Sequence, residues 1–271
     1  THLARLMRAR HPDVLDLLQA HQVHEETLDA VINSLKRLGV NFDLVYRANL
    51  RSAARYDLVV SVGGDGTLLQ ASHVVEDVPV LGVNSDPRRS EAVFCAATGH
   101  NFTRVIHQAL AGRLEACRLY RLQVSLNGRR MGPLVLNDVL IAHDDPATMS
   151  RYHLKIGLRQ EDQKSSGLWV ATAAGSSSAI LAAGGRRLSW MTKRFQYRPR
   201  ELYQGRLNRY RLTGRILSMG EPVAVTWLMR EGAVFIDGPH VRFGLRFGDR
   251  LVVRLSPRHP LRLLGVHAFR P

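Results

Sequence analysis

Apolar residues recur at helical spacing over much of the N-terminal segment. Spacings of three and four residues run through Val14–Gln19 and again through Glu26–Leu38, and Gly39 follows directly. This pattern predicts two helices, the second ended by the glycine. The next segment, Val40–Tyr46, is predicted to be a strand.

Two runs rich in valine and leucine follow, Asp57–Gly63 and Pro79–Asn84, and Leu68–Val75 between them returns to helical spacing. Uninterrupted apolar runs are typical of strands that are buried on both faces of a sheet. A strand, a helix and a second strand in this order join parallel strands. We therefore expect a parallel sheet with flanking helices in the N-terminal part.

Short alternating segments replace this pattern in the second half of the chain, and turn residues separate them. We expect strands over Leu122–Leu126, Pro133–Ala142, Tyr152–Leu158, Tyr210–Ile216, Pro222–Leu228, Ala233–Ile236, Val241–Phe243 and Arg250–Leu255. Asn127-Gly128 between the first two is a strong hairpin signal. One helix is predicted among them, over Ser176–Ala183. The second region is therefore expected to be mainly antiparallel β.

The change of pattern falls within Ser85–Cys117 and divides the chain into two expected domains. We predict an N-terminal α/β domain over residues 1–98 and a β-rich, sandwich-like domain over residues 99–271. Whether the last ~15 residues return to the first domain is left open.

The net charge and the composition limit the classes of binding partner that we expect for this protein. Thirty-eight basic and 23 acidic residues give a net charge of +15, which attracts polyanions. The arginines are scattered, however, and no nucleic-acid-binding motif accompanies them, so we predict no nucleic-acid partner. No apolar run approaches the ~18 residues of a membrane helix, so no membrane association is predicted either.

The cysteines, the first residues and the histidines indicate the cellular compartment and whether a metal site is expected. Two cysteines, Cys95 and Cys117, cannot form a disulfide scaffold and suit a reducing compartment. The first residues lack the apolar core of a signal peptide, so we expect a cytoplasmic protein; whether a targeting segment was trimmed from the N-terminus is left open. The 12 histidines show no paired metal spacing, and no metal-ligating residues are predicted.

The strongest candidate for chemistry is the run Gly63, Gly64, Asp65, Gly66 and Thr67, between a predicted strand and a helix. Consecutive glycines let backbone N–H groups approach a phosphate, and the helix N-terminus adds positive potential. An acidic residue there suits proton acceptance from a hydroxyl, or support of a metal ion that accompanies the phosphate. The alternative is a tight turn in which Asp65 or Thr67 caps the helix.

Two further groups of polar residues stand in apolar surroundings. Asn137 and Asp138 interrupt an apolar strand, where they either face opposite sides of the sheet or mark a bulge or strand end. A strand also leads through Thr172 into a turn of small residues, Gly175–Ser178, whose hydroxyls and N–H groups suit an anion or a ribose. An ordinary serine N-cap is the alternative there.

In this order the three groups resemble the NAD kinase family, which is marked by GGDGT, an Asn-Glu/Asp pair and a Thr-x-x-Gly-Ser/Thr turn. This chain has Gly63–Thr67, then Asn137-Asp138, then Thr172–Ser176, and Phe235–Gly238 is similar to a late strand and turn of the family. The resemblance spans roughly residues 40–255 and is closest to plant-type NADH kinases and mitochondrial NAD kinases.

The resemblance implies a kinase that phosphorylates the adenosine ribose 2′-hydroxyl of NADH or NAD⁺, with ATP and Mg²⁺, to give NADP(H). It implies the NAD kinase/diacylglycerol kinase-like fold, with Asp65 as the catalytic residue that orients and deprotonates the hydroxyl or supports Mg²⁺. A homodimer is also implied. The dinucleotide and its phosphates would contact Gly63, Gly64, Gly66, Thr67, Asn84, Asn137, Asp138, Thr172, Gly175, Ser176 and Ser177.

Three departures from most bacterial members match the plant-type branch. Ser166 replaces an aspartate, Asn84–Pro87 replaces a Leu-Gly-Phe segment, and Ala179 replaces a tyrosine. The lost carboxylate favours NADH over NAD⁺ as a hypothesis, and the sequence leaves this choice open. It also leaves open whether ATP or polyphosphate is the phosphoryl donor.

Two alternatives remain beside this interpretation. A lipid or sphingoid-base kinase shares the GGDGT loop and the general fold, but it would use an apolar substrate cleft. A non-catalytic dinucleotide sensor would gain little from Asp65, because pure binding does not need a carboxylate that faces a phosphate. An Asp65→Asn variant distinguishes the sensor from the enzyme.

Overall fold

The structure is a computed structural model that describes residues 5–7, 9, 11–206 and 209–267. These residues form two compact units. The first unit runs to Ala71 and adds Val78–Ala116 and Leu263–Val266; the second takes Ser72–Asp77, Cys117–Arg262 and His267. The domain boundary after residue 98 stays a prediction. Of the last ~15 residues, whose return to the first domain was left open, residues 268–271 lie outside the described residues.

The first unit contains a parallel sheet with helices, as expected. Its helices are α2 (Pro12–Arg37), α3 (Asp65–Ser72), α4 (Phe102–Leu110) and the 3-10 turn η1 (Arg47–Asn49). The strands of its sheet are β1 (Val59–Val62), β2 (Val80–Asn84) and β3 (Ala97–Thr98), with β4 (Ala116–Leu119) and β17 (Leu261–Leu264), whose residues are shared with the second unit. Their order is β1-β2-β17-β4, with β3 beside β2, and β1, β3 and β17 all run parallel to β2.

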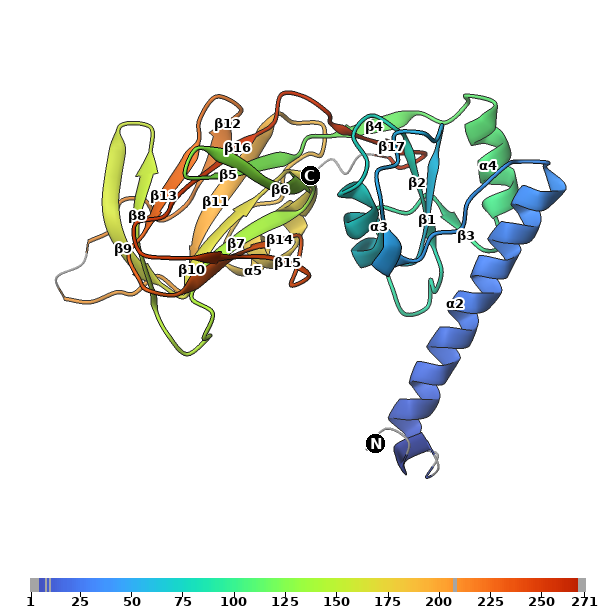
Figure 1. The fold of residues 1–271 in the computed structure, drawn as a ribbon, viewed down its shortest axis with the longest axis horizontal. Helices are drawn as coiled ribbons and strands as arrows, with labels where there is room; N and C mark the ends of the chain where they lie inside the picture. The colour runs from blue at the N-terminus through green and yellow to red at the C-terminus, as the bar shows by residue number, and fades with distance from the viewer. Residues whose placement is uncertain (1–4, 8, 10, 207–208, 268–271) are drawn as a thin grey trace. The chain divides into compact units, whose positions relative to one another are not determined.

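Helix α2 is continuous where two helices were expected. Residues 20–25, between the two periodic segments, contain no glycine or proline, so nothing ends the helix there. Its C-terminal half buries Val31 and Leu35 against Phe102 and Ile106 of α4. Its N-terminal half extends beyond the sheet of its own unit (Figure 1). Three leucines are exposed on this half: Leu15, Leu17 and Leu18.

The predicted strand over Val40–Tyr46 is wrong. This segment has no regular structure, and β1 forms the edge of the described sheet on that side. Val40 and Phe42 still pack against the hydrophobic core of the unit, whereas Leu44 and Tyr46 are exposed. The apolar alternation therefore reflects burial only at its first two positions, where no strand partner is needed.

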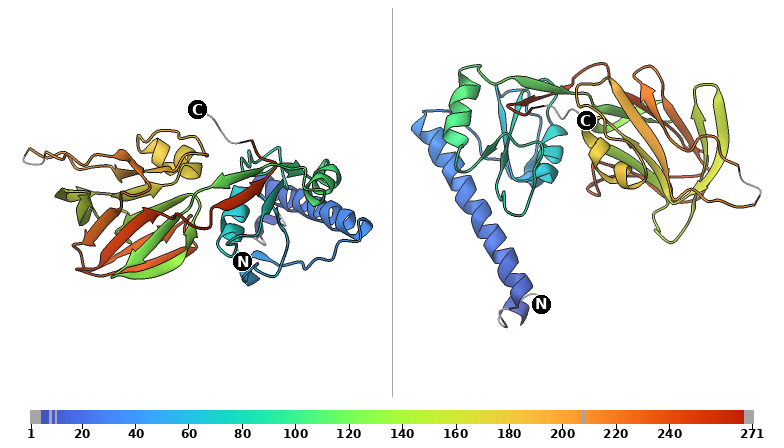
Figure 2. Two further views of the ribbon diagram at one scale, coloured as in Figure 1. Left: turned by 90° about the horizontal axis from the view of Figure 1, so that it is seen from above. Right: turned by 180° about the vertical axis from the view of Figure 1, so that it is seen from behind.

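The second unit is built from two six-stranded sheets packed face to face, which confirms the β-rich, sandwich-like expectation (Figure 2). One sheet has the order β12-β11-β10-β7-β14-β15 and the other β6-β5-β16-β13-β8-β9. The first contains β7 (Asp138–Ala142), β10 (Gly167–Ala171), β11 (Arg194–Arg200), β12 (Arg215–Ser218), β14 (Gly232–Ile236) and β15 (Val241–Leu245). The second contains β5 (Leu122–Leu126), β6 (Arg129–Val135), β8 (Ser150–Ile156), β9 (Arg159–Ser165), β13 (Val223–Trp227) and β16 (Arg250–Leu255).

The strand pairings described in this unit are antiparallel, and its core is large and apolar. Trp227 and Tyr152 stack with their ring centroids 6.5 Å apart at its centre. The Asn127-Gly128 hairpin is confirmed, since φ is 50° at Asn127 and 81° at Gly128, the geometry of a type I′ turn.

The single strand expected over Pro133–Ala142 is wrong, because the chain leaves one sheet after Val135 and enters the other at Asp138. The apolar run continues across the break, since both strands face the same core. Leu136 and Asn137 connect the two sheets, so the strand-end alternative for Asn137-Asp138 is the one observed.

Two other expected elements differ in extent. The helix over Ser176–Ala183 is split into η2 (Ala174–Ser177) and α5 (Ala179–Ala182), because Ser178 is extended with ψ of −146°. Within the segment Tyr210–Ile216, only Arg215 and Ile216 belong to a strand. The Glu161 carboxylate accepts the N–H groups of Arg211 and Leu212, both at 2.9 Å, where a strand partner would otherwise stand.

Candidate active site

The Gly63–Thr67 loop joins β1 to α3, as the sequence predicts. Gly63 has φ of 151° and donates its N–H to the Val83 carbonyl at 2.9 Å. A β-carbon at this position would collide with the Thr67 side chain, so only glycine fits. Thr67 donates its own N–H to the Gly64 carbonyl at 3.0 Å, which closes the first turn of α3. The first N–H groups of such a helix have no partner within the helix and suit an anion.

Asp65 is the first residue of α3, and two backbone groups hold its carboxylate. Oδ2 accepts the N–H of Val93 and Oδ1 the N–H of Phe94, both at 3.0 Å. A carboxylate offers about four lone-pair positions, so two remain for a hydroxyl proton or a metal ion. The side chain is half-buried, which keeps it accessible while its orientation is fixed.

Asn84, at the end of β2, organises the loop that follows. Its Nδ2 donates to the Ser90 carbonyl at 2.8 Å, and its Oδ1 accepts the Asp86 N–H at 3.0 Å. A β-carbon on Gly64 would lie 3.1 Å from the Ser90 hydroxyl, so this loop closes over the glycine loop. The structure thus brings Asn84 and Gly64 to one corner of the first unit, and Asn84 is buried there.

Cys95 lies beneath the same loop, with its Sγ 3.7 Å from the Gly63 carbonyl. Burial, and secondarily the charge of Asp65, raise the pKa of the Cys95 thiol to about 12. The side chain is therefore a neutral thiol and not a nucleophile.

In the second unit, one carboxylate holds the segment that passes between the sheets. Asp237 Oδ1 accepts the N–H groups of Asn137 at 2.7 Å and Asp138 at 3.0 Å, and its Oδ2 accepts that of Leu136 at 2.9 Å. His73 Nε2 lies 2.8 Å from the same Oδ2. Asp237 was not among the predicted site residues, although the Asp-Gly pair after an apolar strand was the available signal.

Asp138 combines burial with hydrogen bonds to one of its oxygens. Oδ2 lies 2.9 Å from the Ser178 hydroxyl and 3.1 Å from Asn137 Nδ2. Burial raises the pKa of Asp138 to about 6, the Ser178 hydrogen bond opposes this, and the charge of Asp237 adds to it. Both side-chain contacts reach Oδ2, so Oδ1 is the oxygen that suits a ligand. Ser178 belongs to the turn whose hydroxyls were predicted to suit an anion or a ribose, but no contact was assigned to it from the sequence.

Thr172 and Gly175 bring the small-residue turn onto Asn137. The Thr172 hydroxyl donates to the Leu136 carbonyl at 2.6 Å and accepts the Gly175 N–H at 3.0 Å. A β-carbon on Gly175 would collide with the carbonyl of Asn137. The structure therefore places the Asn137-Asp138 pair and the Thr172–Ser178 turn side by side, as one polar cluster of the second unit.

The three serines of this turn have different surroundings. Ser176 is buried, where its hydroxyl donates to the Ala173 carbonyl at 2.7 Å and accepts the Leu188 N–H at 2.9 Å. Ser177 is exposed and free to meet a ligand. Ser178 completes the contact with Asp138 described above.

The described part of the chain is informative about membrane-spanning helices and metal centres. Among the described residues, no helix is long and apolar enough to cross a membrane. Across the same residues, no group of three or more His, Cys, Asp or Glu side chains could hold a metal ion.

Comparison with known proteins identifies the relatives of this chain. The family model of the ATP-NAD kinase N-terminal domain matches residues 5–110. A protein named probable NADH kinase from Oryza sativa subsp. japonica is 36% identical over 271 residues, which cover 91% of this chain and 83% of the relative. A protein named NADH kinase from Arabidopsis thaliana is 32% identical over 90% of this chain and 84% of its own length.

The fold is shared with a solved structure. The crystal structure of an NAD kinase from Archaeoglobus fulgidus in complex with ATP has a TM-score of 0.72 and 24% identity, and the match covers 89% of this chain and 90% of that one. The family model and the two plant relatives, which match about nine tenths of this chain, lead to one conclusion: the chain belongs to the NAD kinase family, on its plant-type NADH kinase branch.

Proposed function

We propose that this protein transfers the γ-phosphoryl group of ATP to the 2′-hydroxyl of the adenosine ribose of NADH and NAD⁺. The products are NADPH or NADP⁺, and ADP. The observation that carries this proposal is the Asp65 carboxylate, held by two backbone N–H groups at the start of the helix that follows the glycine loop. Family membership favours a dinucleotide substrate over a lipid or sphingoid base.

In the proposed reaction, Asp65 accepts the proton of the 2′-hydroxyl while the ribose oxygen bonds to the γ-phosphorus. The bond from that phosphorus to the bridging oxygen breaks, and ADP leaves. The first N–H groups of α3 and the backbone of Gly63–Thr67 bind the phosphate oxygens. Such transfer depends mainly on positioning and charge stabilisation, so one carboxylate is chemically sufficient.

We assign Mg²⁺ to the ATP phosphates, with Asp65 as the carboxylate that supports it. The donor set fits this role, because Mg²⁺ usually combines one or two carboxylates with substrate phosphates and water. The described residues contain no larger acidic cluster that would hold the ion by itself. When bound, the ion would neutralise charge on the transferred phosphoryl group.

For the dinucleotide, we propose that Asn137 and Asp138 bind the adenosine and its ribose. Asp138 Oδ1 is the acceptor for a ribose hydroxyl, and the exposed Ser177 hydroxyl and nearby N–H groups meet the phosphates. Thr172, Gly175 and Ser176 support this surface through the contacts of the turn.

Preference for NADH over NAD⁺ is a further part of the proposal. Ser166 lies between β9 and β10, is half-buried, and donates its N–H to the Arg200 carbonyl at 2.8 Å. Ser166 carries no charge where most bacterial members carry an aspartate. A carboxylate would favour the cationic nicotinamide of NAD⁺, so the serine favours the neutral ring of NADH.

We also propose a homodimer and a cytoplasmic location, both of which stay predictions. Light scattering of the purified protein and fractionation of cells that express it would test them. The phosphoryl donor is tested by replacing ATP with inorganic polyphosphate.

The experiment that tests the proposed function is product identification. The purified protein is incubated with ATP, Mg²⁺ and NADH, and NADPH is detected with a dehydrogenase specific for the 2′-phosphorylated cofactor. We expect NADPH that depends on all three components. Absence of NADPH, together with tight NADH binding, would instead support the non-catalytic sensor.

A further inference from the structure

His73 and Asp237 form the most buried of the described histidine–carboxylate pairs. His73 Nε2 lies 2.8 Å from Asp237 Oδ2, and their side chains are 10% and 0% exposed. The other two described pairs, His153–Asp162 and His259–Asp77, have aspartates that are 78% and 76% exposed. Of the aspartates in these three described pairs, Asp237 is the one whose side chain is fully removed from water.

The direction of this hydrogen bond follows from the other partners of Asp237. Its carboxylate accepts three backbone N–H groups, from Leu136, Asn137 and Asp138, which a carboxylate can do without a proton of its own. Its Oδ2 therefore accepts from the imidazole, and His73 donates its Nε2–H. Loss of this donor would leave Oδ2 with Leu136 alone among the partners described.

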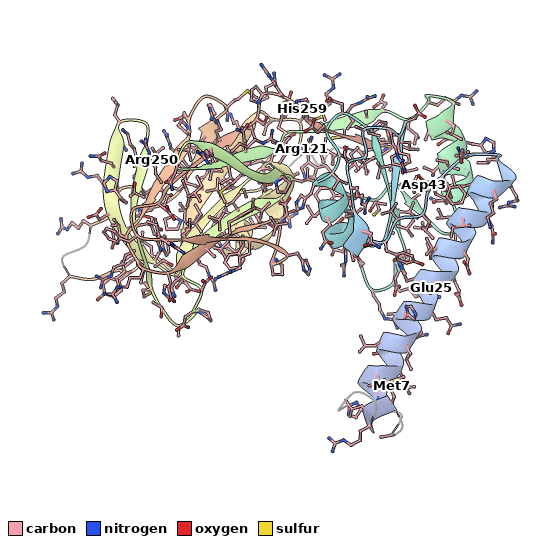
Figure 3. The ribbon with its side chains drawn as sticks, in the orientation of Figure 1. Met7, Glu25, Asp43, Arg121, Arg250 and His259 are labelled. Carbon is pink, nitrogen blue, oxygen red and sulfur yellow. The ribbon has the colours of Figure 1, made fainter. Side chains whose placement is uncertain are left out.

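Position 73 is itself held firmly. It is the residue after helix α3, in the segment Ser72–Asp77 that belongs to the second unit. The buried Arg121 guanidinium donates to the carbonyls of Ser72 at 3.0 Å and Val75 at 2.7 Å, on either side of His73. Arg121 also bonds the His259 carbonyl, and the two residues lie next to each other in Figure 3. The imidazole is thus presented from a fixed backbone.

We propose that His73 is a positioning residue for the dinucleotide: it donates to Asp237, which fixes the Leu136–Asp138 backbone and so aims the Asn137 and Asp138 side chains. The inference rests on the proposed function, because it assigns dinucleotide binding to Asn137 and Asp138. His73 does not touch the substrate in this account. It acts on affinity for the dinucleotide, and the ATP site of the first unit is not expected to respond.

The experiment compares four variants of the full-length chain. His73→Leu removes the donor, and His73→Asn keeps an amide that is too short to reach the Nε2 position. His73→Gln places an amide nitrogen near Nε2 and restores the donor. His153→Leu is the matched control, because it breaks an exposed histidine–aspartate pair of the same unit.

NADH binding is measured by its fluorescence without ATP, and the KM values for NADH and ATP are measured separately. Because a hydrogen bond to a charged group is lost, we expect His73→Leu and His73→Asn to raise the NADH dissociation constant about 10-fold. The KM for ATP should stay within about twofold, and His73→Gln should recover most of the NADH affinity. His153→Leu should match the wild type.

Two outcomes would overturn the inference. One is a folded His73→Leu or His73→Asn protein whose NADH affinity equals that of the wild type. The other is an equal loss in all three His73 variants with KM for NADH and ATP raised alike, which would indicate a general structural role. A wild-type protein that neither binds nor phosphorylates NADH would contradict the proposed function itself, so the two failures are distinguishable.

Discussion

Gly175 lies so close to Asn137 that a β-carbon at position 175 would overlap the Asn137 carbonyl. This contact holds the small-residue turn against the segment between the two sheets. Gly175→Ala should therefore push the turn away and lower the free energy of unfolding by about 3 kcal/mol. NADH affinity should fall with it, because Asn137 and Asp138 would shift.

The matched control is Gly220→Ala, in the same unit, where a β-carbon would meet nothing within 4 Å. Its free energy of unfolding should stay within about 0.5 kcal/mol of the wild type. Urea denaturation followed by tryptophan fluorescence measures both variants. Equal stability of the two alanine variants would contradict the close packing described for Gly175.

Because the pKa of Asp138 is raised, we predict that its contribution to the free energy of unfolding depends on pH, with a definite sign. Its pKa is raised by burial from 3.8 to about 6, so the folded protein holds a proton that the unfolded chain releases at lower pH. The contribution of this group to stability is therefore greatest at low pH, and it falls as the pH rises from about 4 to about 6. The full difference is about 3 kcal/mol.

An Asp138→Asn variant removes this titration. It should be more stable than the wild type above about pH 6, with a smaller change between pH 4 and 6. Glu231→Gln, at an exposed carboxylate of the same unit, should leave the pH profile unchanged. An Asp138→Asn profile that runs parallel to that of the wild type would show that Asp138 does not titrate in this range.

We predict that replacing Arg121, which is not among the proposed substrate contacts, strongly lowers the free energy of unfolding. The side chain is 1% exposed and donates to the carbonyls of Ser72, Val75, Glu76 and His259. Burial lowers its pKa to about 10. Arg121→Met leaves these acceptors without their donor, so the free energy of unfolding should fall by about 3 kcal/mol or more.

Arg118→Met serves as the comparison, since Arg118 is exposed on β4, three residues earlier. Thermal unfolding should show little change for that variant. Similar melting temperatures for the two variants would mean that solvent can replace the Arg121 hydrogen bonds at no cost.

We predict that a substitution at Ser166 changes the preference of the enzyme between NADH and NAD⁺. Ser166→Asp returns the carboxylate of most bacterial members and should raise kcat/KM for NAD⁺ relative to NADH by about fivefold to 10-fold. Ser52→Asp, an exposed position of the first unit outside the predicted site, controls for the added charge. An unchanged ratio in Ser166→Asp would end the argument that this position selects NADH.

Sequence patterns predicted the elements whose cause is local. The Asn127-Gly128 turn needs positive φ at both residues, and the apolar run of β2 is buried along its whole length, whereas that of β1 is mostly half-buried. The strand predicted over Val40–Tyr46 is wrong because apolar alternation alone does not show strand pairing, and in this segment only Val40 and Phe42 pack against the core. Likewise, an apolar run could not show that the chain changes sheets at Leu136 and Asn137.

The candidate site was predictable only where the chemistry lies in one short segment. Gly63–Thr67 is such a segment, since the collision between Gly63 and Thr67 is local. Asp237 was missed because its partners Leu136–Asp138 lie about 100 positions earlier. The contact of the Ser178 hydroxyl with Asp138 could not be predicted, because the two residues lie 40 positions apart and α5 begins only after Ser178.

The most direct test of the central claim compares wild-type protein with Asp65→Asn in two measurements, the rate of NADPH formation and NADH binding. Asp57→Asn, at an exposed residue ahead of β1, is the matched control. Asp65→Asn should lower kcat by about 10²- to 10⁴-fold, as expected for loss of a general base, and keep NADH affinity within about threefold. Wild-type turnover that survives in Asp65→Asn would contradict phosphoryl transfer centred on Asp65.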